Sequence, residues 1–161
     1  MTTEKFQACL HSISNCMLMN KLKLNDDKSE LLVLRASHRP SHQLGYLLMG
    51  DEYIKPSSNA KNIGVVLDDT MSMDSQMMAV CKLCFYHIRC VSRIRRYLSL
   101  EDTKQLVQAF VISRIDYCNS LLFGLPNNLL DRLQHVLHSA ARLITLTKKY
   151  DHITPSLLEL H

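Results

Sequence analysis

Residues 74–98 read DSQMMAVCKLCFYHIRCVSRIRRYL, and this stretch decides the character of the second half of the chain. Apolar and thiol side chains recur in it at spacings of three, four and seven residues, so they share one face of a helix that turns by about 100° per residue. They are Val80, Cys84, Val91, Ile94 and Leu98. The pattern predicts one long amphipathic helix whose apolar face is buried in a core.

The opposite face of the predicted helix carries positive charge and one aromatic ring. Its members are Lys82, Tyr86, Arg89, Arg93 and Arg96. No acidic residue occurs within residues 80–98. Lysine and arginine neutralise the phosphates of nucleic acids, so a stripe of this kind predicts a nucleic-acid-binding surface. The simpler interpretation, which this feature alone favours, is a solvated basic face on an ordinary core helix.

The rest of the chain predicts a small antiparallel β-rich part followed by a helical part, which is an α+β fold. Before residue 70 we expect a helix over residues 3–22 and a hairpin over residues 46–54 whose turn uses Gly50. Short buried strands are expected over residues 31–34 and 63–67, with a loop over residues 56–59.

After about residue 70 the chain is expected to be helical throughout. A second helix is predicted over residues 99–122, where Ser99 and Asp102 have the spacing of a capping box. A third is predicted over residues 126–147, and a fourth begins at residue 154. We therefore expect two domains, residues 1–70 and residues 71–161.

The composition favours a folded intracellular protein. Hydrophobic residues make up 47% of the 161 residues and glycine and proline number 4 each, so a core can form and disorder is not expected. The net charge of +4 suits a polyanionic partner without identifying one. There is no signal-peptide pattern and no stretch long enough to span a membrane. We therefore expect a cytoplasmic or nuclear location and free, mostly buried thiols.

One cluster of residues resembles a zinc site in spacing but not in geometry. Cys81, Cys84, His87 and Cys90 recur in steps of three, which drift by about 60° each on a helix. The first and last side chains therefore point to nearly opposite faces, and four ligands of a tetrahedral ion could not converge. We expect core thiols here and no metal site.

Other polar groups also lack a catalytic arrangement. Asp68 and Asp69 have no partner carboxylate on a second apolar strand, which a two-metal site requires. With Asp74 they are interpreted as acids of a strand-ending turn and a helix cap. Arg114 and Asp116 are interpreted as partly buried groups that hold helices together. No hydrolase triad and no glycine-rich phosphate loop occurs, so no catalytic residue is predicted.

Several strings along the chain resemble one known family in order and spacing. They are residues 9–10 (CL), 19–25 (MNKLKLN), 28–30 (KSE), 62–65 (NIGV), 113–119 (SRIDYCN), 122–126 (LFGLP), 132–134 (RLQ), 140–143 (AARL) and 152–155 (HITP). Together they resemble the reverse transcriptase of non-LTR (LINE-type) retrotransposons, especially the jockey-like group. The similarity covers essentially the whole chain. Each string alone is weak evidence for the family, but the series of strings in this order and spacing is specific.

The resemblance implies that residues 1–70 are the C-terminal remnant of a polymerase palm and that residues 71–161 are the thumb and the region after it. Lys28 then matches the lysine of a palm motif that can lie near the triphosphate, and residues 62–65 match the primer-grip region. The thumb embraces the RNA/DNA template–primer duplex in the parent enzyme, which gives the basic face of residues 82–96 a role. Mg²⁺ is implied only for the complete enzyme, and no cofactor is expected in this chain.

The departures from the family decide the expected activity. The catalytic aromatic–Ala–Asp–Asp motif and a further upstream aspartate are absent, and the chain has no tryptophan. We therefore expect a fragment of an RNA-directed DNA polymerase that is inactive alone, truncated at both ends as in a decayed copy of a transposable element. The alternative is a small basic helical module that binds nucleic acid or protein without enzymatic activity. Truncation also predicts self-association through exposed edges of the N-terminal strands.

Overall fold

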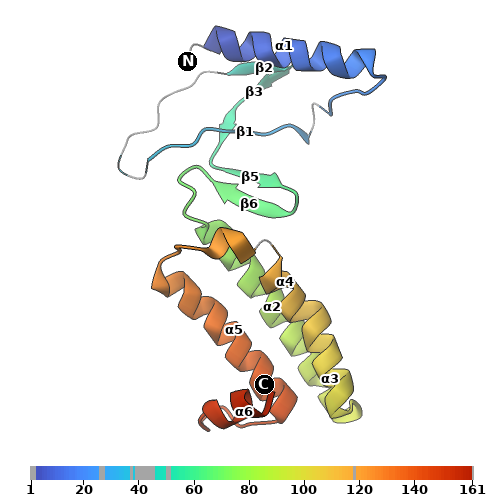
Figure 1. Ribbon diagram of the computed structural model, residues 1–161, viewed down its shortest axis with the longest axis vertical. Helices are drawn as coiled ribbons and strands as arrows, with labels where there is room; N and C mark the ends of the chain where they lie inside the picture. Colours follow the sequence, from blue (N-terminus) through green and yellow to red (C-terminus); the bar gives the residue numbers. More distant parts are fainter. Residues whose placement is uncertain are drawn as a thin grey trace. The chain divides into compact units, whose positions relative to one another are not determined.

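The computed structural model describes residues 3–25, 28–36, 38, 46–49, 52–117 and 119–160. The chain divides into two compact units, Met1–Ser72 and Met73–His161, each of which is described by itself (Figure 1). Short strands and one helix make up the first unit and helices make up the second, so the predicted α+β class is confirmed. The assignment of these parts to a palm and a thumb stays a prediction.

The described part of the first unit holds one long helix and three two-stranded ribbons. Helix α1 (Thr3–Met19) ends three residues before the predicted bound. The ribbons pair β1 (Leu31–Leu32) with β4 (Pro56–Ser57), β2 (Leu47–Met49) with β3 (Glu52–Ile54), and β5 (Asn59–Asn62) with β6 (Val65–Asp68). The first pair is parallel and the other two are antiparallel.

Both antiparallel ribbons are tight hairpins. In the β2–β3 hairpin, Met49 pairs with Glu52, which confirms the predicted hairpin, while the conformation of Gly50 lies outside the described residues. In the β5–β6 hairpin, Ile63 (φ 47°) and Gly64 (φ 83°) occupy the turn. Two consecutive positive φ angles are typical of a type I′ turn. The strand predicted over residues 63–67 therefore begins two residues later.

Two further predictions for this unit were wrong in detail. The strand predicted over residues 31–34 is limited to Leu31–Leu32, and the loop predicted over residues 56–59 contains β4 and the start of β5. The Ser57 hydroxyl donates to the carbonyl of Leu31, 3.4 Å away. A proline in β4 is compatible with this edge position, because an edge strand can dispense with one N–H donor.

The second unit is built from helical segments, as predicted. They are α2 (Asp74–Ile94), η2 (Arg95–Tyr97), α3 (Leu100–Val107), η3 (Gln108–Ile112), α4 (Ser113–Asp116), η4 (Asn119–Leu122), α5 (Asn127–Thr145) and α6 (Thr154–Leu160). The capping box at the start of α3 is confirmed: the Ser99 hydroxyl accepts from the Asp102 N–H, and the Asp102 carboxylate accepts from the Ser99 N–H. The chain later turns at Gly124 (φ 78°), and α5 starts after Pro126.

The helix predicted over residues 99–122 is not continuous. Its middle is the π-helical segment η3, and the helix ends at Asp116, after which Tyr117 is extended. A π turn closes on i→i+5 hydrogen bonds, so the side chains after it shift around the axis relative to an unbroken α-helix. Arg114 and Asp116 are exposed, and the interpretation of them as partly buried was wrong.

The hydrophobic core of the described chain lies in the second unit. Its members are Met77, Cys81, Cys84, Ile88, Val107, Val111, Leu129, Leu133, Val136, Ala140 and Ile144. Helix α5 packs along α2 to form this core. In the first unit Leu47 and Val65 are the buried hydrophobic residues among those described, and none of the side chains described on α1 is buried.

One residue of the predicted apolar face of α2 does not join this core. Ile94 is 46% exposed and is the last residue of α2, directly before the 3₁₀ turn η2. Val80 and Leu98 are half-buried, while Cys84 and Val91 are buried as expected. Within the described residues, no helix combines the length and the apolar character needed to cross a membrane.

Candidate nucleic-acid interface

Five of the six residues predicted to bind nucleic acid lie together on one face of α2 and η2. They are Lys82, Tyr86, Arg89, Arg93 and Arg96, here named the basic stripe, and all five are exposed. The residues that α2 buries are Gln76, Met77, Cys81, Cys84, Ile88 and Val91, which follow the other side of the helix. At a rise of 1.5 Å per residue, the stripe extends for about 21 Å. The sixth residue, Lys28, is exposed in the first unit and does not belong to this surface.

The positive charge of the stripe is not neutralised by the described chain. Ion pairs found among the described residues join Arg35 to Asp69 and Lys104 to Glu101. In the stripe, Arg89 Nε donates to the carbonyl of Phe85 at 3.3 Å, which fixes its side chain along the helix without removing its charge. These cations therefore remain available for phosphates, which the sequence pattern alone could not establish.

A hollow of about 740 Å³ lies where the ends of α2 and α5 meet, and it was not predicted. Four cations line it, namely Arg95 and Arg96 of η2, Arg142 of α5 and Lys149 of the following loop. Carboxylates do not occur among its lining residues, and Ser92, Ser139 and Thr147 add hydroxyl groups. We name this site the basic hollow. Arg96 belongs to it and to the basic stripe, so the two positively charged surfaces are continuous.

Arg95 holds the two walls of the basic hollow together. Its guanidinium donates to the carbonyls of Leu143 at 3.1 Å and Ile144 at 3.0 Å in the last turn of α5, and to that of Leu98 at 2.9 Å. The last carbonyls of a helix have no partner within the helix and carry partial negative charge, so an arginine is well suited to them. The sequence pattern does not predict this contact, because Arg95 and Leu143 are distant in sequence.

Arg142 fixes the loop that supplies Lys149. Its guanidinium donates to the carbonyl of Lys148 and, at 2.8 Å, to that of Asp151. The same loop is closed by a hydrogen bond of 3.2 Å from the Asp151 N–H to the Lys148 carbonyl. Lys149 and Tyr150 therefore form the tip of a turn whose two ends are held by one side chain.

The adjacent aspartates of the first unit are occupied by structural contacts. The Asp68 carboxylate is buried and accepts from the N–H groups and the hydroxyls of Thr70 and Ser72. The Asp69 carboxylate pairs with Arg35 at 2.7 Å. The interpretation as a strand-ending turn is therefore supported. At the start of α2 the N-cap residue is Met73, without a side-chain cap hydrogen bond, and Asp74 is the acidic residue of the first turn.

Two of the thiols on α2, those of Cys81 and Cys84, are buried. Burial raises the pKa of the Cys84 thiol to about 11, and the neighbouring Cys81 adds to this shift. A thiol with a raised pKa is a poor nucleophile, since the thiolate is the reactive form. His87 stacks on Phe110 with ring centroids 5.2 Å apart. Across the described residues, no three side chains of His, Cys, Asp or Glu gather in a way that could hold a metal ion.

The remaining thiols differ from the sequence expectation. Cys81 and Cys84 are buried and Cys90 is half-buried, but Cys9 and Cys16 on α1 are exposed. The expectation of mostly buried thiols was therefore wrong for α1. The reason is that this helix buries none of its described side chains.

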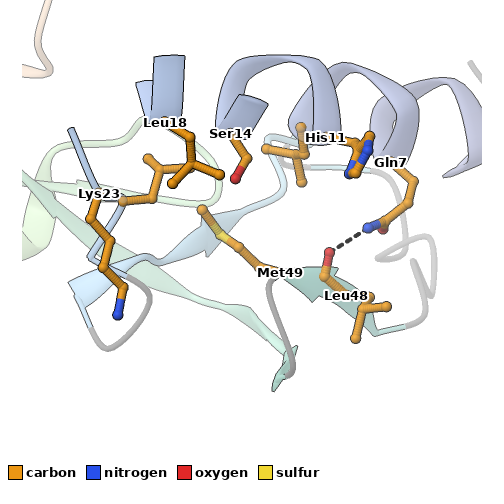
Figure 2. A pocket seen from close by; sticks show the side chains of 9 residues that line it. Gln7, His11, Ser14, Leu18, Lys23, Leu48 and Met49 are labelled. Carbon is orange, nitrogen blue, oxygen red and sulfur yellow. Dashed lines mark hydrogen bonds between the residues drawn. The ribbon is translucent and has the colours of Figure 1, made fainter. Parts of the chain in front are cut away.

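The first unit contains a smaller hollow of about 310 Å³ between α1 and β2. Figure 2 shows Gln7, His11, Ser14 and Leu18 of α1 facing Leu48 and Met49 of β2 across it. The Gln7 amide donates to the carbonyl of Leu48 and so ties the helix to the strand. Its lining mixes apolar and polar groups and pairs no nucleophile with a base, so it is a weaker candidate site than the basic hollow.

Comparisons with protein-family models, with curated proteins and with solved structures gave no match for this chain. The family resemblance therefore rests on the sequence strings alone. The candidate interface rests on the charge, exposure and contacts of the residues described above.

Proposed function

We propose that this chain is a nucleic-acid-binding part of a non-LTR retrotransposon reverse transcriptase and that it binds the RNA/DNA template–primer duplex without polymerising DNA. The observation that carries the proposal is the basic stripe. Its four cations are exposed on one face of α2 and η2 and are not paired with carboxylates of the described chain. The order of the sequence strings supports the proposed family, and an RNA/DNA duplex is the substrate that this family implies.

The size of the stripe suits a phosphate backbone. A duplex carries one charge per strand for about every 3.4 Å of its axis, so a stripe of about 21 Å can follow several consecutive phosphates. Neutralising four phosphates predicts that log K falls with log salt with a slope of about −3.6. This corresponds to about a 150-fold loss of affinity between about 50 and 200 mM salt.

The proposed lack of polymerase activity follows from the aspartates of the chain. The sequence has no aromatic–Ala–Asp–Asp string. Asp68 and Asp69 are engaged by Thr70, Ser72 and Arg35, and so are not free to share two metal ions. Asp26 and Asp27 lie outside the described residues.

The test uses the full chain and a fluorescently labelled RNA/DNA duplex. We expect binding in an anisotropy titration, with the steep salt dependence given above. Primer extension with Mg²⁺ and deoxynucleotides should yield no product. Absent or salt-independent binding would reject duplex binding and leave the protein-interaction alternative, whereas templated incorporation would contradict the proposed lack of polymerase activity.

A further inference from the structure

Two dipeptides with the same chemistry stand at the basic hollow. In η2, the Arg96 guanidinium lies over the ring of Tyr97, 4.6 Å from its centroid. In the loop after α5, the Lys149 ammonium lies 5.9 Å from the centroid of Tyr150. Both cations line the hollow, and the two tyrosines beside them are 73% and 91% exposed. Each wall of the hollow therefore carries a cation that is followed in sequence by an exposed tyrosine, and the tyrosines lie beside the lining residues and not among them.

The cations of the hollow are suited to phosphate groups. Arg95 uses three of its five N–H donors on backbone carbonyls, and Arg142 uses two, so both guanidiniums are fixed in place and retain donors. A fixed guanidinium binds phosphate with little loss of side-chain entropy. Arg96 and Lys149 add two more charges at the same hollow.

The tyrosines decide which form of nucleic acid fits. Bases of a duplex are stacked on one another and do not offer their faces to a protein, whereas unpaired bases stack on exposed aromatic rings. Cations next to exposed aromatic rings are the arrangement that binds single strands.

The turn that carries Tyr150 is held at both ends. Tyrosine at the tip of a free loop would lose conformational entropy on stacking, and this cost would weaken binding. Here both ends of the turn, the carbonyls of Lys148 and Asp151, accept hydrogen bonds from Arg142. The backbone on both sides of Tyr150 is therefore held before a ligand arrives, and the ring itself is 91% exposed.

We propose that the basic hollow binds unpaired nucleotides of a single-stranded extension, with Arg95, Arg96, Arg142 and Lys149 on its phosphates and Tyr97 and Tyr150 on its bases. This inference rests on the proposed function, because Arg96 also belongs to the basic stripe and makes the extension continuous with the bound duplex. It goes further by assigning a second site to the unpaired part of the substrate.

The experiment measures binding of the full chain to three labelled nucleic acids: a blunt duplex, the same duplex with a short single-stranded extension, and the extension strand alone. We expect the extended duplex to bind about tenfold more tightly than the blunt one, since stacking of one base has about this effect. Tyr150→Ala should clearly reduce the difference, because one of the two stacking rings is lost, and Tyr150→Phe should retain it, because the phenylalanine ring also stacks. Phe123→Ala is the matched control, since Phe123 is 95% exposed and lies just before the other end of α5.

The outcomes separate this inference from the proposed function. Equal affinity for blunt and extended duplexes would overturn the inference and leave duplex binding in place. Binding of the single strand that Tyr150→Ala weakens, without binding of the blunt duplex, would support the inference and overturn the proposed function. Loss of the difference in Phe123→Ala as strongly as in Tyr150→Ala would also overturn the inference, and binding to none of the three would overturn both.

Discussion

Replacing Arg89 and Arg93 together by glutamine tests the basic stripe most directly. The double variant removes two of the four cations from the stripe and leaves the basic hollow intact. Removing one cation that neutralises a phosphate should reduce the salt slope by about 0.9, so the slope for a duplex should change from about −3.6 to about −1.8. The loss of affinity between about 50 and 200 mM salt should then shrink from about 150-fold to about 12-fold.

A matched control separates the stripe from net charge. The variant Arg114→Gln/Arg132→Gln makes the same chemical change at two exposed arginines of α4 and α5. Both double variants lower the net charge from +4 by the same amount, and exposed substitutions of this kind should change the free energy of unfolding by less than about 0.5 kcal/mol per site. Anisotropy titrations at several salt concentrations give the slopes. The reasoning is refuted if the stripe variant and the control variant reduce the magnitude of the salt slope equally, or if neither variant reduces it.

Other expected outcomes concern the fold. Hydrogen exchange should be slower in α2 and α5 than in β1 of the same sample, because the core cluster lies in the second unit; equal protection in a monomer would contradict the expectation of a weaker, self-associating first unit. At about pH 8 a thiol reagent should modify Cys9 rapidly and Cys84 only on unfolding, since burial raises the pKa of Cys84, and peptide mass spectrometry resolves the two sites. Ser99→Ala should lower the free energy of unfolding by about 1 kcal/mol in a denaturant titration. Hydrogen bonds from Ser99 also lower the pKa of Asp102, so the stabilisation that depends on the ionised carboxyl should be present at neutral pH and be lost as the pH falls through the lowered pKa. Ser99→Ala should make this dependence on pH smaller.

The helical half could be predicted because its signals are local. The spacing of apolar residues over residues 74–98, the pair Ser99 and Asp102, and the proline before α5 each act within one or two turns of a helix. The exposed basic stripe follows from the same periodicity, since the side chains that share one face of a helix depend only on their spacing. In the first unit, the β2–β3 hairpin was predictable for a similar reason, because its strands are adjacent in sequence.

The remaining features depend on contacts between distant segments. The parallel pairing of β1 with β4 needs partners about two dozen residues apart, and the π-helical segment η3 interrupts a helix that was predicted as continuous. A strand of two residues, such as β1, is too short to show a periodic pattern of apolar residues. A π turn adds one residue to a helical turn, and the spacing of the polar residues does not reveal it.

Local sequence patterns were sufficient for the α+β class, the helices and the basic stripe of this protein, whereas the basic hollow arises only when the helices pack. Arg95 contacts the carbonyl of Leu143, and Arg142 holds both ends of the Lys148–Asp151 turn. These hydrogen bonds end on backbone carbonyls, which every residue carries, so the identity of the acceptor residue gives no signal. The hollow exists because α5 packs along α2 and brings the ends of both helices to one place.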